Sequence, residues 1–93
     1  MGIAEDIEWL KDDENGVGKI FRFIAEREGS GVRLRELKEF YGSDNWWPVK
    51  VCARALVDRD LVYKDREKLD FKLTDSGKKV WQSFRAMEHV REI

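Results

Sequence analysis

The chain has little of what builds disulfides, metal sites and membrane spans. Its 93 residues include one cysteine, one histidine and one proline. A single cysteine cannot form an internal disulfide, so nothing in the sequence points to an oxidising compartment. No stretch approaches the roughly 18 consecutive apolar residues of a membrane-spanning helix, and the N-terminus has no basic start followed by an apolar run. We therefore expect a cytoplasmic protein that has no membrane segment.

Signatures of catalysis and of bound cofactors are also missing. The segment 15–19 (NGVGK) resembles part of a phosphate-binding loop, but the full motif needs glycine and serine or threonine where Asp13 and Ile20 stand. One cysteine and one histidine cannot build an ordinary zinc site, so we expect Cys52 to be a small buried hydrophobe and His89 a surface residue. No nucleophile is paired with a base. We expect neither an enzyme nor a cofactor or metal.

Charge, in contrast, is abundant: 40% of the residues are charged, and the net charge is only −1. Residues 1–14 contain six acidic residues and one lysine, a net charge of −5, whereas the other 79 residues contain 17 Lys and Arg and 13 Asp and Glu, a net charge of +4. An acidic leader on a mildly basic body is compatible with nucleic-acid binding by the body. The leader could also compete with DNA for the basic face.

Apolar residues recur at helical spacing in five segments, which predicts five helices. The predicted helices are residues 3–13, 17–28, 34–41, 46–60 and 74–91. The first is too short to be stable alone, so it must dock on its own chain or on a second subunit. The broad apolar face of the second predicts a central, buried helix. Thr74 is the expected N-cap of the last, whose apolar stripe is either core or part of a dimer interface.

The fourth predicted helix has two distinct faces. Asn45 and Pro48 supply N-cap and first-turn chemistry at its start. Its inward stripe is expected to contain Val49, Cys52, Ala53, Leu56 and Val57, and its outward face Trp47, Lys50, Arg54 and Asp58. Trp46 and Trp47 are consecutive, so one is expected in the core and the other, with Trp47 slightly favoured, at the surface. Lys50 and Arg54 either form a solvated face or contact DNA.

After this helix the apolar period changes from helical to two, which predicts a β-hairpin. Its strands are residues 61–64 and 69–73, and its charged tip is residues 65–68. Residues 32 and 33 are expected to be a brief extended link. The predicted fold class is α+β, mostly α.

Three features of this chain resemble the winged helix-turn-helix superfamily, in particular the small MarR-, PadR- and ArsR-like transcription regulators of archaea, bacteria and their viruses. Two short helices are separated by the tight turn 42–45 (GSDN). The passage 55–62 (ALVDRDLV) looks like a recognition helix that runs into the first wing strand. The passage 71–77 (FKLTDSG) is similar to the step from the wing to the last helix.

The length of 93 residues predicts one domain, residues 1–93. The resemblance covers residues 17 to about 80 and implies a winged-helix core (17–73) with a two-stranded wing, between an N-terminal helix (1–15) and a C-terminal helix (74–91). It implies that helix 46–60 enters the DNA major groove and that the wing tip lies over an adjacent minor groove or phosphate ridge. The implied DNA-binding residues are Arg33, Arg35, Lys38, Trp47, Lys50, Arg54, Lys64, Arg66 and Lys68. It further implies a homodimer formed through the terminal helices.

Two functions are therefore expected as alternatives. The first is that of a homodimeric transcription regulator that binds double-stranded DNA. The second is that of a winged-helix protein–protein interaction module whose contacts are Trp46, Trp47 and the terminal helices. The weak net charge of the outward helix face and the acidic leader favour the second.

Overall fold

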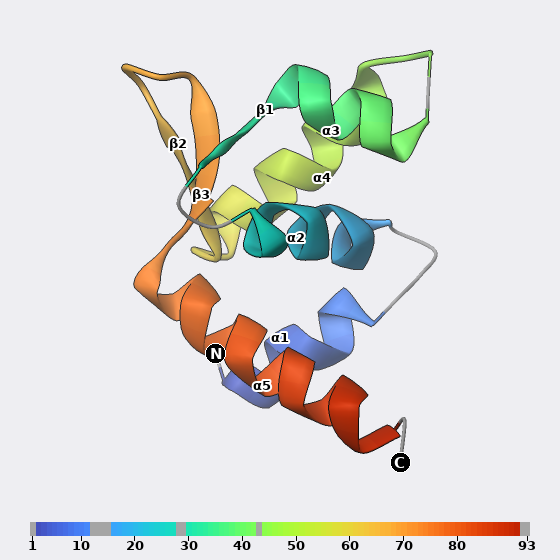
Figure 1. Ribbon diagram of the computed structural model, residues 1–93, viewed down its shortest axis with the longest axis vertical. Helices are drawn as coiled ribbons and strands as arrows, with labels where there is room; N and C mark the ends of the chain where they lie inside the picture. The colour runs from blue at the N-terminus through green and yellow to red at the C-terminus, as the bar shows by residue number, and fades with distance from the viewer. Residues whose placement is uncertain (1, 12–15, 28–29, 43, 92–93) are drawn as a thin grey trace.

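The computed structural model describes residues 2–11, 16–27, 30–42 and 44–91, without the side chains of Ile3 and of residues 87–91. In these ranges the chain is α+β and mostly helical (Figure 1). The elements in chain order are α1 (Ile3–Leu10), α2 (Val17–Glu26), β1 (Val32–Arg33), α3 (Leu34–Tyr41), α4 (Trp47–Asp58), β2 (Val62–Asp65), β3 (Asp70–Leu73) and α5 (Asp75–Arg91). The predicted helices and hairpin are confirmed, with differences at their ends.

Helix α2 lies in the middle of the molecule, with α3 and α4 on one side and α1 and α5 on the other (Figure 1). It is the predicted central helix. Its buried side chains are Val17, Ile20, Phe21, Ile24 and Ala25. These residues form a broad apolar stripe, and α2 contacts the other four helices and strand β3.

The two ends of α4 are set by its flanking residues. The side-chain oxygen of Asn45 accepts the backbone N–H of Trp47 at 3.0 Å, and Trp46 becomes the N-cap. The helix stops at Asp58, and Asp60 then adopts a left-handed backbone with φ of 61°. The helix is therefore shorter than the predicted 46–60.

The sheet has three antiparallel strands in the order β1-β3-β2, so the predicted two-stranded wing is extended by one strand. The expected link at residues 32 and 33 is this additional strand, β1. Val32 pairs with Phe71 in register, and both side chains are buried. A two-residue strand has no apolar period of its own, but the burial of Val32 against β3 fixes it in the sheet.

Helices α1 and α5 pack side by side and form the end of the molecule away from α3 (Figure 1). Ile7 and Leu10 of α1 and Val80 and Phe84 of α5 are buried in this chain. The first helix therefore docks on its own body. It ends at Leu10, and residues 12–13 of the predicted helix 3–13 lie outside the described part of the chain, as does residue 28 of the second.

Two glycines, Gly18 in α2 and Gly77 in α5, allow their helices to lie close to the backbone of neighbouring segments. A Cβ on Gly18 would lie 2.1 Å from the carbonyl oxygen of Leu10, and a Cβ on Gly77 would overlap the carbonyl oxygen of Leu61. Thr74 confirms its predicted role as N-cap of α5, because its hydroxyl oxygen accepts the backbone N–H of Gly77 at 2.9 Å. The backbone contacts at both glycines leave no room for a side chain.

The C-terminal end of α4 is held by α1. A guanidinium nitrogen of Arg59, the C-cap of α4, donates to Oδ1 of Asp6 at 3.1 Å. The guanidinium carbon also lies 4.1 Å from the ring centroid of Trp9. Asp6 is only 8% exposed, so the positive charge of Arg59 balances the charge of a nearly buried carboxylate.

None of the helices in the described ranges combines the length and the apolar character that crossing a bilayer requires.

Candidate nucleic-acid interface

Helix α4 presents the outward face that its sequence predicts. Trp47, Lys50 and Arg54 are exposed, whereas the opposite face is buried. The buried side chains are Val49, Cys52, Ala53 and Leu56. Val57, expected in the inward stripe, is 39% exposed, because the stripe centres on Val49 and Leu56 and position 57 lies about 100° further around the helix.

The expectation that one of the two consecutive tryptophans is buried is wrong. Trp46 is 41% exposed and Trp47 is 69% exposed. Trp46 precedes the first helical residue, so its direction follows the turn rather than the inward stripe. The ammonium of Lys38 on α3 lies 4.9 Å from the centroid of its ring. Both indoles therefore belong to the surface, and Trp47 is the more exposed, as expected.

Basic residues of β1 and α3 accompany this face, because α3 packs against α4. Arg33 and Arg35 are exposed, and Lys38 is half-buried beside Trp46. Glu36 and Glu39 alternate with them along α3. Acidic residues therefore interrupt the positive charge along α3.

The hairpin contributes the remaining predicted basic residues, Lys64, Arg66 and Lys68, which are all exposed. The Asp65 carboxylate organises the turn by accepting the backbone N–H groups of Glu67 at 2.9 Å and Lys68 at 3.2 Å. These hydrogen bonds, led by the one from Lys68, hold the pKa of the Asp65 carboxyl below its ordinary value. The turn thus has a defined backbone shape, with charges of both signs.

The hairpin tip differs from the prediction at two residues. Leu69, expected to begin a strand, lies in the turn with φ of 58° and is 59% exposed. Asp70, a polar residue of the alternating pattern, is only 6% exposed, and its Oδ1 has no hydrogen-bond partner within the described residues. Gly31 covers it so closely that a Cβ there would lie 2.1 Å from Asp70 Oδ2. The tip lies one residue later than the alternation suggests.

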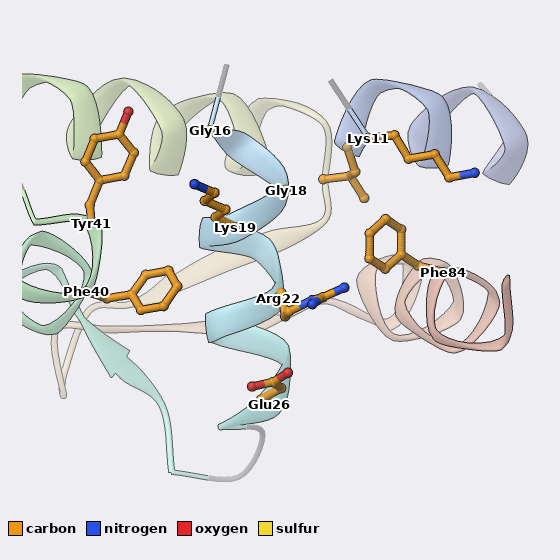
Figure 2. Close-up of a pocket in the computed structure, with 10 residues that line it drawn as sticks. Lys11, Gly16, Gly18, Lys19, Arg22, Glu26, Phe40, Tyr41 and Phe84 are labelled. Carbon is orange, nitrogen blue, oxygen red and sulfur yellow. The ribbon is translucent and has the colours of Figure 1, made fainter. Parts of the chain in front are cut away.

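The structure also has a concave feature that was not predicted from the sequence. A cleft of about 1080 Å³ lies beside α2 and is lined by residues at α1, α2, α3 and α5. Figure 2 shows these residues as sticks. The lining of the cleft combines cationic, anionic and aromatic side chains, including Lys11, Lys19, Glu26, Tyr41 and Phe84. These residues are scattered along the sequence, so no local pattern could have indicated the cleft.

The part of the chain that the structure describes lacks a recognisable metal site. Within the described residues, no group of three or more His, Cys, Asp and Glu side chains has the arrangement of a metal site. Cys52 is buried, as expected, and burial raises the pKa of its thiol. The side chain of His89 lies outside the described part of the chain.

Comparisons of this chain with protein-family models, with curated proteins and with solved structures give no match.

Proposed function

We propose that the protein binds double-stranded DNA through α4, as a winged-helix transcription regulator. The supporting observation is the exposed face of α4, which carries Trp47, Lys50 and Arg54 and is followed directly by a β-hairpin with exposed basic residues. The helical and strand layout is compatible with a winged helix, in which such a helix enters the major groove.

In this proposal the basic side chains of β1, α3 and the hairpin contact phosphates, and α4 reads base edges. Because acidic residues separate the basic ones, the predicted number of neutralised phosphates is small. We expect about four or five, which corresponds to a slope of log K against log salt near −4.

The test is fluorescence anisotropy of a labelled duplex across a salt series. Lys50→Glu/Arg54→Glu should lose most of the binding. The matched control Lys79→Glu/Arg85→Glu makes the same change in charge at exposed positions of α5 and should retain it. Absence of binding by the wild type at about 50 mM salt, where phosphate contacts are strongest, would refute the proposal.

The proposed homodimer would place two α4 helices about 34 Å apart on a pseudo-palindromic site. Ile7, Leu10, Val80 and Phe84 are already buried within one chain. A dimer through α1 and α5 must therefore use the other side chains of these helices. Sedimentation equilibrium over a range of protein concentrations would detect it, and a monomer at every concentration would refute it.

One observation favours the alternative protein-interaction module: Trp46, Trp47 and Val51 are all exposed at one end of α4. An exposed apolar group of this kind is typical of contact surfaces between proteins. In that case the duplex would not bind, and replacement of Trp47 by alanine would abolish capture of the partner.

The competition by the acidic leader can also be tested. Deletion of residues 1–14 would remove Ile7 and Leu10 from the core. The better variant is Glu5→Lys/Glu8→Lys, since both side chains are exposed. Competition predicts DNA binding at low salt that is tighter than that of the wild type and of the charge-matched control Glu26→Lys/Asp75→Lys, whose exposed positions lie outside the proposed interface. Unchanged affinity would refute it.

A further inference from the structure

The N-terminal end of α4 exposes more aromatic surface than duplex recognition requires. Trp47 is the most exposed large apolar side chain in the described part of the chain, at 69%. The two remaining tryptophans, Trp9 and Trp81, pack partly against the core. Exposed apolar area of this size is unfavourable in water unless a ligand covers it.

The backbone that carries the exposed indole is also held in place. The side-chain oxygen of Asn45 accepts the backbone N–H of Trp47, and Pro48 follows immediately in the first turn, where its ring restricts the backbone. Little backbone freedom is left to lose at this position when a ligand binds. The backbone at Trp47 is therefore preorganised.

The charges around the two indoles favour an anionic ligand. The ammonium of Lys38 lies 4.9 Å from the ring centroid of Trp46. Lys50 and Arg54 share the outward face with Trp47 and lie about 4.5 Å and 10.5 Å further along the helix axis. Asp44, just before the tryptophans, is an exposed opposing charge. Cations next to aromatic rings are the combination that binds the phosphates and bases of an unpaired strand.

A fully paired duplex cannot use the face of the Trp47 ring. The faces of its bases are covered by their neighbours in the stack, and an indole in the major groove reaches only base edges. An unpaired base, in contrast, offers a whole face to an aromatic side chain.

We infer that Trp47 stacks on an unpaired base, so that the protein prefers a duplex with an unpaired nucleotide beside the α4 site over a fully paired duplex. This inference rests on the proposed function, because α4 must lie against the duplex for Trp47 to reach an adjoining unpaired base. Base–aromatic stacking predicts about 5- to 150-fold tighter binding, which is about 1–3 kcal/mol.

The experiment compares the affinities of the wild type for a labelled duplex and for the same duplex with a single-nucleotide bulge, at one salt concentration. Trp47→Ala should bring the ratio of the two affinities to about one, whatever its effect on the paired duplex, whereas Trp47→Phe should keep most of the preference. Val51→Ala is the matched control, because Val51 is an exposed apolar residue on the next turn of the same helix. A 2-aminopurine at the bulge should be quenched by the wild type and by Val51→Ala but not by Trp47→Ala.

The outcomes separate the two proposals. If wild-type protein binds both duplexes with equal affinity, the stacking inference is wrong and duplex binding stands. If the bulge is preferred but Trp47→Ala retains the preference, Trp47 is not the stacking residue and the inference also fails. If neither duplex binds at about 50 mM salt, both proposals fail, and a protein partner is the occupant to seek.

Discussion

Replacement of Arg59 by alanine tests whether α1 is a structural part of the body. Arg59 donates to the carboxylate of Asp6 and lies against the ring of Trp9, so one substitution removes two contacts between α4 and α1. Asp6 is then left nearly buried without this donor.

The expected loss follows from these two contacts. A hydrogen bond between charged groups contributes about 1.5–3 kcal/mol and a cation–π contact about 0.5–1 kcal/mol. The Arg59 side chain is 29% exposed, so the low ends of both ranges apply, and the sum is about 2 kcal/mol. For a domain of this size, that corresponds to a fall in Tm of about 8–16 °C.

Urea unfolding followed by circular dichroism would measure this loss. A double-mutant cycle with Asp6→Ala should give a coupling energy of at least about 1 kcal/mol. The control Arg54→Ala removes an exposed arginine from the same helix and should change stability by less than about 0.5 kcal/mol. If Arg59→Ala is as mild as this control, or if the cycle gives no coupling, the ion pair does not hold α1 in place.

Three further predictions concern backbone contacts and the hairpin. Gly18→Ala places a Cβ against the carbonyl oxygen of Leu10 and should cost about 3 kcal/mol in urea unfolding, the upper end for overpacking, because backbone must move; a loss below about 1 kcal/mol would contradict the close approach. Gly31→Ala should lower the free energy of unfolding, because a φ of 75° disfavours a side chain and because the new Cβ would clash with Asp70. Addition of Asp70→Ala should recover only the part of the stability that the clash costs. If Gly31→Ala costs the same stability with and without Asp70→Ala, no clash occurs. The pKa of Asp65 is lowered, so its stabilising contribution is present above the ordinary value of 3.8 and is lost as the pH falls through the lower, folded-state pKa. Wild type and Asp65→Ala should therefore converge in stability as the pH falls below 3.8, and a constant difference would exclude this role.

The helices could be predicted from the sequence because each repeats its apolar residues over several turns. The N-cap role of Thr74 was predictable for a similar reason, since capping depends on nearby residues only. Strand β1 could not be predicted, because Val32 is its one apolar residue and its partner Phe71 is distant in sequence. Local patterns carry no information about such a pairing.

The candidate site was predictable only in part. The direction of Trp47, Lys50 and Arg54 followed from helical geometry once the inward stripe of α4 was known. The exposure of Trp46 did not, because it depends on where the helix begins. The position of the hairpin tip was predicted wrongly for a related reason, since a shift of one residue moves Leu69 from a strand into the turn. Element ends, rather than element types, limited the prediction.

The packing of α1 along α5 has a consequence for the synthesis of this chain. Helix α1 leaves the ribosome before α5, so it must wait for α5 before their interface can close. At about 5–20 residues per second, the intervening segment takes several seconds to emerge. During that time, α1 lacks the helix along which it packs. The nascent chain thus exposes an unfinished apolar surface on α1 until α5 is released.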